Sequence, residues 1–256
     1  MSAAGFGDVA AAEKAGARRS FPSLANNRPS PIAPPTDSAV SCFHASGEPL
    51  HSAAVIRRIS IVDYGMGNLF SVARAFSHLA CEVTVTSDPA AVREAEAVLL
   101  PGVGAFAEAM ARLDAAGLSG ALRDRAAADR PLFGVCLGMQ LLFAESAEYG
   151  RHAGLGVFHG AVSPLPAASG LKIPHMGWNQ VRAVGDSPLL RGLDGEDFYF
   201  VHSFAVPDSP EAAGRTDYGE SFVSAAARGA VAATQFHPEK SSAAGLALYR
   251  NWLEAF

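Results

Sequence analysis

The sequence predicts an α/β fold, in which a mostly parallel, doubly wound sheet carries helices on both faces and added antiparallel strands in the C-terminal half. Three observations support this prediction. Short apolar runs alternate with helical patterns four times between residues 59 and 135. After Gly150 the pattern changes to short β-like runs that Gly and Pro punctuate. Hydrophobic residues make up 49% of the chain, which is enough for a large core. Strands that alternate with helices are typical of parallel sheets.

Two regions of the 256-residue chain differ in composition. Residues 1–54 are rich in Ala, Ser, Pro and Gly, and their apolar residues show no periodicity. Such a segment buries too little surface to offset its ordering entropy. We therefore predict a disordered N-terminal extension over residues 1–54, or sequence upstream of the true start. Residues 55–256 are predicted to form one folded domain.

Charge and cysteine content exclude several classes of function. The net charge of −5 gives no electrostatic basis for binding nucleic acid or an anionic membrane surface. No apolar run approaches the roughly 20 residues of a membrane span. The three cysteines, Cys42, Cys81 and Cys136, are too few and too scattered for a disulfide framework or a zinc site. These observations favour a cytoplasmic protein.

The elements of the first half follow from apolar periodicity. Residues 59–62, 82–86 and 97–100 are predicted strands, and residues 63–68 form a Gly-rich turn after the first of them. Two helical segments lie between residues 106 and 128, separated near Gly117. The first predicted helix presents one apolar face, made of Leu69, Val72, Ala73, Phe76 and Leu79.

The second half begins with a predicted buried strand at residues 131–135. The helix after it has Leu137, Leu141 and Leu142 as apolar positions and Glu145 as a polar one. Further strands are predicted at 161–165, 178–184, 198–206, 222–227 and 230–235. The last element is a helix from about residue 242, with a buried stripe made of Leu246, Tyr249, Trp252, Leu253 and Phe256.

The turn around Cys136 concentrates the chemistry of the chain. Gly134 and Gly138 flank this cysteine between a strand and a helix, which is the pattern of a nucleophile elbow with cysteine in place of serine. Small neighbours allow the strand and helix to approach, and the helix N-terminus favours a thiolate and can hold an oxyanion. The alternative is a small buried hydrophobic residue, which is the usual role of a lone cysteine.

A histidine and a carboxylate follow near the C-terminus. In extended chain His237 and Glu239 project to the same side, so Glu239 can orient His237 as a base toward a thiol. A His-x-Glu pair alone is common, and it gains meaning here from the elbow and the predicted fold. Of the other histidines, His175 and His202 lie in richer contexts but lack a carboxylate two residues on. The remaining ones are expected at the surface or in the core: His44, His51, His78, His152 and His159.

Two glycine turns follow predicted strands. The turn at residues 63–68 lacks the third glycine of a dinucleotide-binding loop, so ordinary loop geometry is the better interpretation. The turn Pro101-Gly102-Val103-Gly104 precedes a helix, so its N–H groups are able to face an anion. Alone it is only a turn.

Taken together, these motifs resemble those of the class I (triad-type) glutamine amidotransferases. The resemblance rests on residues 133–140 with His237-Pro238-Glu239 and spans roughly residues 56–256. Within that class the chain is similar to the glutaminase subunits of imidazole glycerol phosphate synthase, where Val103 replaces the usual proline of the glycine turn. The further segments that carry this similarity are 63–69, 101–106, 172–179, 198–203 and 235–241. The resemblance implies a flavodoxin-like sheet.

The resemblance also implies roles for individual residues. Cys136 is the nucleophile that attacks the amide of glutamine and forms a thioester, His237 is the base, and Glu239 orients His237. The N–H groups of Leu137 and of the turn with Val103 and Gly104 form the oxyanion hole, and Val103 reorients before its N–H serves. The implied substrate-binding residues are Gly102, Gln140, Tyr199 and Ser203.

A protein partner follows from the same resemblance. The expected partner is the cyclase subunit, a (β/α)₈ barrel that forms a heterodimer with this chain and receives the ammonia. Its products are imidazole glycerol phosphate and aminoimidazole carboxamide ribonucleotide, the former for histidine synthesis. Asn68, Trp178 and Lys240 are placed near the interface, although Trp178 could otherwise be a core residue and Lys240 a solvated one.

Other functions remain open at this stage. Within the class, the alternative is the amidotransferase subunit of anthranilate or aminodeoxychorismate synthase. The Pro101–Gly104 turn and residues 172–179 argue against this alternative. Outside it, a stand-alone γ-glutamyl hydrolase, an esterase or a non-catalytic scaffold with a structural thiol would share the elbow. No metal or organic cofactor is implied, because the sequence contains no cluster of ligands.

Overall fold

The computed structural model describes residues 58–166 and 170–255. The predicted extension at 1–54 and the predicted stripe residue Phe256 lie outside these residues. The helices are α1 (Leu69–His78), α2 (Pro89–Glu94), α3 (Phe106–Ala115), α4 (Leu118–Ala127), α5 (Leu137–Leu142) and α6 (Ser242–Ala255), with 3₁₀ turns η1 (Pro188–Leu190) and η2 (Pro238–Lys240). The strands are β1 (Arg58–Val62), β2 (Glu82–Thr86), β3 (Ala97–Leu100), β4 (Leu132–Val135), β5 (Phe143–Ser146), β6 (His152–Ala153), β7 (Phe158–Pro164), β8 (His175–Ala183), β9 (Glu196–His202), β10 (Phe204–Ala205), β11 (Ala212–Tyr218), β12 (Glu220–Arg228) and β13 (Val231–Thr234).

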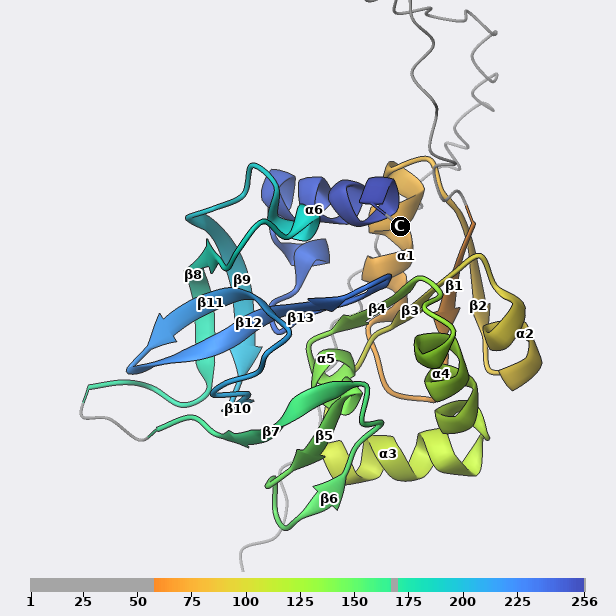
Figure 1. Cartoon of the computed structure of the whole chain (residues 1–256), viewed down its shortest axis with the longest axis horizontal. Coiled ribbons are helices and arrows are strands. Elements are labelled where there is room, and N and C mark those ends of the chain that lie inside the picture. The colour runs from red at the N-terminus through yellow and green to blue at the C-terminus, as the bar shows by residue number, and fades with distance from the viewer. Residues whose placement is uncertain (1–57, 167–169, 256) are drawn as a thin grey trace, which may run out of the picture. The chain divides into compact units, whose positions relative to one another are not determined.

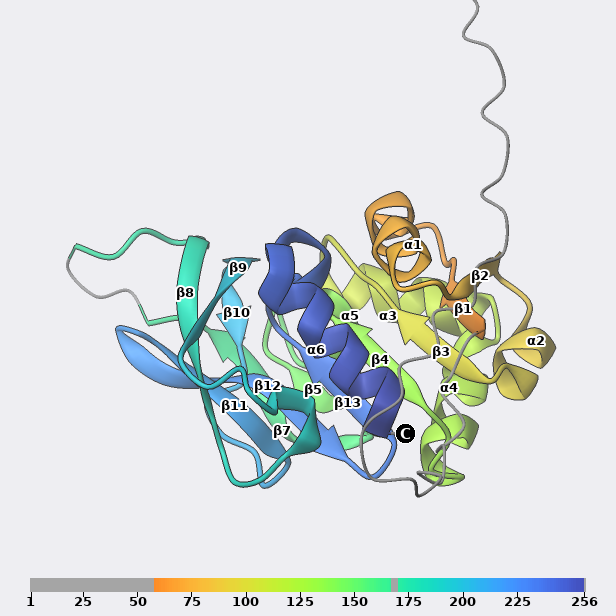
Figure 2. The same cartoon turned by 90° about the horizontal axis from the view of Figure 1, so that it is seen from above.

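The main sheet has nine strands in the order β2-β1-β3-β4-β13-β12-β11-β8-β9. The half from β2 to β13 is parallel, and every pair from β13 to β9 is antiparallel. The predicted α/β fold, with antiparallel strands added by the C-terminal half, is confirmed. Viewed from above, β8, β9 and β11 lie at one end of the sheet and β1 and β2 at the other (Figure 2).

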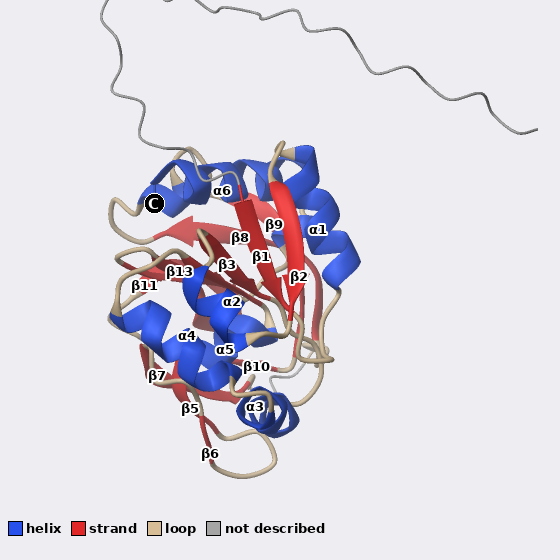
Figure 3. Cartoon of the chain, turned by 90° about the vertical axis from the view of Figure 1, so that its right-hand side faces the viewer, coloured by secondary structure: helices blue, strands red, loops and turns tan. Residues whose placement is uncertain are grey.

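The inner parallel strands β3, β4 and β13 are buried on both faces, whereas the edge strand β2 is largely exposed. Alternate residues of the inner strands enter two separate cores. Ile59 and Ile61 of β1 pack with α1 and α6, whereas Val62 belongs to the opposite core. Likewise Leu99 of β3 joins the first core and Leu100 the second, with α2, α3, α4 and α5. Figures 1 and 3 show these two helical layers on either side of the sheet. The period of two along each strand therefore produces the doubly wound arrangement.

A second sheet of four strands, in the order β10-β7-β5-β6, lies beside α3 and α5 (Figure 1). Strand β5 of this sheet was predicted to belong to the helix after Cys136, and that prediction was wrong. The helix after Cys136 ends at Leu142, and Phe143–Ser146 is extended, so Glu145 is a strand residue that pairs with Ala153 and Ala161. The helix is short because the N–H groups of Leu155 and Val157 donate to the carbonyls of Leu141 and Leu142 at its end.

Three further elements were not predicted, namely α2, β6 and β11. The single strand predicted at 198–206 is two strands, β9 and β10, separated at Ser203. Within the two described ranges, none of the helices combines the length and the apolar character that crossing a membrane requires.

The arrangement of the sheet positions the candidate site. The turns after β1, β3 and β4 and the segment after β13 all leave the same edge, because these four strands are parallel. Cys136, His237 and both glycine turns therefore converge at the C-terminal ends of the strands, where ligands bind in sheets of this kind.

Candidate active site

Cys136 lies on the sharp turn that the sequence predicted. Its backbone has φ 55° and ψ −111°, a conformation that residues other than glycine rarely adopt. A Cβ on Gly138 would lie 1.9 Å from the carbonyl oxygen of Leu100, and one on Gly134 would lie 2.9 Å from the carbonyl oxygen of Gly138. Glycine is required at both positions because strand, turn and helix approach this closely.

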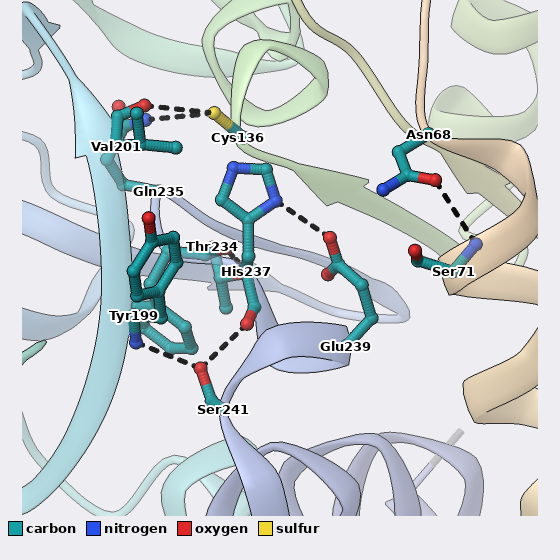
Figure 4. Close-up of polar contacts among 11 residues, drawn as sticks. Asn68, Ser71, Cys136, Tyr199, Val201, Thr234, Gln235, His237, Glu239 and Ser241 are labelled. Carbon is teal, nitrogen blue, oxygen red and sulfur yellow. Dashed lines mark hydrogen bonds and ion pairs between the residues drawn. The ribbon is translucent and has the colours of Figure 1, made fainter. Parts of the chain in front are cut away.

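The thiol of Cys136 is buried among polar groups. Its Sγ lies 3.9 Å from the carbonyl oxygen of Val201, and the side-chain amide of Gln235 donates to Sγ at 3.8 Å. Figure 4 shows these two contacts on one side of the sulfur and the ring of His237 on another. The sulfur is thus not packed in a purely apolar site, as a structural cysteine would be.

His237 and Glu239 form a buried pair. Nδ1 of His237 is 2.8 Å from Oε1 of Glu239, and the side chains are only 4% and 1% exposed. The prediction of extended chain from His237 to Glu239 was wrong: residues 238–240 form the turn η2, which brings the carboxylate back to the ring. Among the described residues, Nε2 of His237 has no hydrogen-bond partner, and it points toward Cys136 (Figure 4).

The free edge of β9 holds the histidine segment. The N–H of His237 donates to the carbonyl of Tyr199 at 2.9 Å, and the N–H of Tyr199 donates to Oγ of Ser241 at 3.0 Å. The same hydroxyl donates to the carbonyl of His237 at 2.7 Å. Val201, two residues further along this edge, supplies the carbonyl beside Cys136. The unpaired backbone of an edge strand therefore positions both the imidazole and the thiol (Figure 4).

The electrostatics of the pair favour a protonated imidazole. Burial alone would lower the pKa of His237, but the interactions of the imidazole with the nearby Cys136 and with its hydrogen-bond partner Glu239 outweigh burial and raise the pKa to about 9. A buried group with so large a shift, next to a nucleophile and in a pocket, is typical of an active site.

The two glycine turns support each other. The hydroxyl of Tyr64, in the first turn, donates to the carbonyl of Pro101, at the start of the second, at 2.9 Å. A Cβ on Gly104 would lie 2.7 Å from the side chain of Met66. The turn at residues 63–68 is therefore a support for the turn at 101–104, whose residue Val103 is 45% exposed.

A pocket of about 270 Å³ opens over the thiol. Of the predicted oxyanion and substrate residues, Val103, Gly104, Leu137 and Gln140 line it together with Cys136 and His237. Gly102, Tyr199 and Ser203 do not belong to this lining. Over residues 58–166 and 170–255, no group of three or more His, Cys, Asp or Glu side chains could hold a metal ion.

The amide of Gln140 has a defined orientation. Its Nε2 donates both to the carbonyl of Phe204 and to Oε1 of Gln235, each at 2.9 Å. An amide nitrogen carries two hydrogens, so both are used within the protein. Only Oε1 of Gln140 remains for a ligand, which makes this side chain a hydrogen-bond acceptor in the pocket.

Several pocket residues were missed by the sequence analysis. Glu148, His202 and Phe204 line the pocket, and Gln235 holds Gln140 and the thiol. Oε2 of Glu148 accepts from the N–H of Phe106 at 2.7 Å, at the start of α3. His202 and Gln235 lie in the segments 198–203 and 235–241 that carry the family resemblance, but no role was assigned to them, and Glu148 and Phe204 lie outside all of these segments. Segments far apart in the chain bring the four residues together.

The predicted interface residues have local contacts of their own. Asn68 is the N-cap of α1, and its Oδ1 accepts from the N–H of Ser71 at 3.2 Å. Trp178 is 54% exposed and meets the ring of Tyr199 edge-on, with ring centroids 6.1 Å apart. Nζ of Lys240 lies 5.8 Å from the centroid of the same tyrosine ring, and Lys240 also lines the pocket. Trp178 is thus not a core residue.

Comparison with known proteins identifies the family. The model of the family "Glutamine amidotransferase class-I" matches residues 60–255. Two curated relatives are named imidazole glycerol phosphate synthase subunit HisH: one from Moorella thermoacetica is 51% identical over 202 residues (78% of this chain, 95% of the relative), and one from Methanothermobacter thermautotrophicus is 47% identical over 197 residues (77% and 98%). Two solved structures share the fold at low identity. They are a glutamine amidotransferase (TM-score 0.61, 20% identity, 77% of this chain and 99% of that one) and PurLQS from Thermotoga maritima (TM-score 0.60, 18%, 77% and 98%). The thiol, imidazole and carboxylate thus lie within the matched residues, and the chain belongs to the class-I glutamine amidotransferases.

Proposed function

We propose that this chain is the glutamine-hydrolysing subunit of an imidazole glycerol phosphate synthase, and that residues 55–256 form its amidotransferase domain. The observation that carries the proposal is the buried pair of His237 and Glu239, with the free Nε2 of the histidine directed at Cys136 in a pocket. The names of the curated relatives support the choice of synthase.

The mechanism uses the three groups in sequence. The thiolate of Cys136 attacks the side-chain amide carbon of glutamine, and His237 holds the thiol proton. His237 then donates this proton to the amide nitrogen, so that the C–N bond breaks, ammonia leaves and a thioester remains. A water molecule, deprotonated by His237, attacks the thioester, and glutamate and the thiol are released. Glu239 keeps Nδ1 of His237 protonated and oriented throughout.

The tetrahedral intermediates need hydrogen-bond donors for their oxyanion. The N–H of Leu137 is one donor, since the first intrahelical bond of α5 starts only at Gln140. The second is the N–H of the turn with Val103 and Gly104. Loss of one such donor costs on the order of a hundredfold or more in rate. If Val103 must reorient before it donates, hydrolysis stays slow until the turn moves.

The charges of the pocket suit a free amino acid. Glutamine carries an ammonium and a carboxylate group at its α-carbon, and the pocket is lined by Glu148 and Lys240. We assign the ammonium to Oε1 of Glu148, because Oε2 already accepts from Phe106. Oε1 of Gln140 accepts a further hydrogen bond from the substrate. Gly102, Tyr199 and Ser203 stay as predicted substrate residues outside the pocket lining.

Free ammonia would be lost to water, so the product needs an acceptor nearby. The proposed partner is the cyclase subunit, a (β/α)₈ barrel, in a cytoplasmic heterodimer that makes imidazole glycerol phosphate and aminoimidazole carboxamide ribonucleotide. Trp178 and Lys240, which share contacts with Tyr199, and Asn68 at the start of α1 are the proposed contact residues. The partner's ligand is expected to stimulate glutamine hydrolysis.

The test is co-purification with the cyclase subunit, followed by a glutaminase assay with and without the cyclase's nucleotide substrate. We expect a stable complex, stimulation by the nucleotide, and no glutamate release by Cys136→Ala. Glutamate release by Cys136→Ala would refute the thiol mechanism. Hydrolysis that ignores the partner and its nucleotide would instead favour a stand-alone γ-glutamyl hydrolase.

A further inference from the structure

Two buried histidines outside the proposed catalytic groups form a chain of hydrogen bonds. Nδ1 of His202 lies 2.9 Å from the carbonyl oxygen of Phe204, and Nε2 of His202 lies 3.0 Å from Nδ1 of His175. Nε2 of His175 in turn lies 3.3 Å from Nδ2 of Asn179. The chain of contacts runs from β8 to the wall of the pocket, which His202 and Phe204 line.

The carbonyl at one end determines the direction of every bond in this chain. A carbonyl oxygen only accepts, so Nδ1 of His202 carries a hydrogen and, in the neutral ring, Nε2 is an acceptor. Nδ1 of His175 must therefore donate to it, which leaves Nε2 of His175 as the acceptor for the amide of Asn179. Both rings are neutral and both carry their hydrogen on Nδ1. No donor or acceptor nitrogen of either ring is left for a substrate.

The environment keeps both rings neutral. His175 is stacked between the rings of Phe200 and Tyr218, with ring centroids 4.8 and 4.0 Å away. Burial lowers the pKa of His175 to about 4, and that of His202 to about 3 against the opposing effect of the Phe204 carbonyl. A proton on either ring would turn an acceptor nitrogen into a second donor and break the chain.

The chain continues from Phe204 to the nucleophile. The carbonyl that accepts from His202 also accepts from Nε2 of Gln140. The other hydrogen of that amide goes to Oε1 of Gln235, whose Nε2 donates to Sγ of Cys136. Unbroken hydrogen bonds thus connect β8 to the sulfur atom, and the Phe204 carbonyl is their junction.

We propose that His175 and His202 are positioning residues, which fix the Phe204 carbonyl and thereby hold the amide of Gln140 with its oxygen toward the substrate. This inference rests on the proposed hydrolysis of glutamine. It also connects the pocket to β8, a strand whose opposite side exposes Met176 and Trp178, the latter a proposed partner contact.

The test compares two variants of His202 in the full chain bound to the cyclase subunit. His202→Phe keeps the ring volume beside Phe200 and Phe222 but removes both nitrogens. His202→Asn loses ring volume but places an amide N–H where Nδ1–H was. We expect the KM for glutamine to rise on the order of five- to tenfold in His202→Phe, the effect of about one hydrogen bond, and clearly less in His202→Asn.

The free energy of unfolding should follow the opposite order: His202→Phe should be the more stable variant, because Phe fills the site and Asn does not. If the KM follows packing instead, with His202→Phe closer to the wild type than His202→Asn, the inference is wrong. His175→Phe, a residue that does not line the pocket, should also raise the KM, by about two- to fivefold. An unchanged KM in His175→Phe would likewise contradict the proposed positioning role of the two histidines.

A second measurement is independent of hydrolysis. Nitrogen-15 NMR of the histidine-labelled wild-type protein should show two neutral imidazoles protonated on Nδ1 between pH 6 and 8, assigned through His175→Phe and His202→Phe. A ring protonated on Nε2 at either position would refute the proposed chain of hydrogen bonds. A wild-type protein that lacks glutaminase activity but shows both Nδ1 tautomers would count against the proposed function alone.

Discussion

At the residue scale, Cys136 is held in a backbone conformation that would cost about 1–3 kcal/mol for an unconstrained cysteine. The surrounding contacts enforce it: the carbonyl oxygen of Leu100 lies where a side chain on Gly138 would begin. Hydrogen bonds on both sides of the turn, from Cys136 N–H to Thr234 and from Gln140 N–H to the Cys136 carbonyl, hold the residue between β13 and α5.

Substitution of Gly138 is therefore expected to abolish activity. In Gly138→Ala the new methyl group would lie 1.9 Å from the Leu100 oxygen, so that α5 must move away from β3 and carry Leu137 with it. Glutamine hydrolysis should fall at least a hundredfold, as for loss of an oxyanion donor. The control is Gly120→Ala in α4, where the nearest atom is 3.6 Å away. It should keep full activity and gain up to about 1 kcal/mol of stability.

The pKa of His237 can be measured by NMR titration. We expect a value of about 9, and a lower value in both Cys136→Ala and Glu239→Gln, because each partner raises it. An unchanged pKa in either variant would show that the partner in question does not interact with the imidazole as described.

The same shift predicts how stability depends on pH. Because the folded-state pKa lies above the ordinary value of 6.5, protonated His237 contributes stability fully below pH 6.5, and this contribution is lost as the pH rises through 9. Urea unfolding should therefore show a loss of at most about 3 kcal/mol between pH 6.5 and 9.5. Glu239→Gln should flatten this dependence.

Some of these residues could be predicted from the sequence, and others could not. Cys136, His237 and Glu239 stand in short motifs whose chemistry is readable without a fold. Glu148 lies outside every recognised segment. His202 and Gln235 lie within the segments 198–203 and 235–241, but their roles depend on contacts with residues far apart in the chain. Gln235 and Cys136, for example, are 99 positions apart. Such contacts follow from the strand order, which the sequence alone does not specify.

At the element scale, Arg125 connects α4 to α2 and to the sheet. The residue is 1% exposed, and its guanidinium donates to five backbone carbonyls, those of Val92, Arg93, Ala95, Glu96 and Pro131. Burial lowers its pKa to about 10, so it remains charged at neutral pH. One side chain thus provides hydrogen-bond donors for the backbone carbonyls at the end of α2 and just before β3 and β4.

Removal of Arg125 should be strongly destabilising. Arg125→Met removes a buried charged donor from all five carbonyls, although those of Arg93 and Ala95 still accept from Arg130 and that of Pro131 from the N–H of Val98. We expect a loss of about 3 kcal/mol in the free energy of unfolding. Arg125→Lys should recover only part of it, because an ammonium has three donors. Urea denaturation measures both. Arg112→Ala, which breaks the exposed pair with Glu108 in α3, should cost under about 0.5 kcal/mol.

The elements that escaped prediction share a physical reason. α2 has only six residues and one buried side chain, Val92, so it shows no helical period. β11 reads Ala-Ala-Gly-Arg-Thr-Asp-Tyr, without apolar alternation, and forms because β8 and β12 lie on either side of it. β5 follows α5 without a break, and tertiary hydrogen bonds rather than local preference end the helix. By contrast, the inner parallel strands β3 and β4 were predictable because each is a continuous apolar run.

At the scale of the whole molecule, the fold is built from two cores that lie on opposite faces of one sheet. Every described element lies within the range that the family model matches, apart from the first residues of β1. We therefore expect residues 55–256 to contain everything that catalysis needs. Deletion of residues 1–54 should leave the urea midpoint unchanged and kcat for glutamine within about twofold of the full-length value. A larger loss of either would assign residues 1–54 a role in the domain.

The free edge of β9 has a consequence beyond catalysis. An uncovered outer strand can recruit a strand from another molecule and start aggregation. Here the backbone of Tyr199 is already occupied by His237 and Ser241, so the catalytic segment also blocks intermolecular pairing at that position. Loss of the Ser241 hydroxyl would therefore expose the protein to self-association as well as displace its base, and inactive variants of this segment should also precipitate more readily.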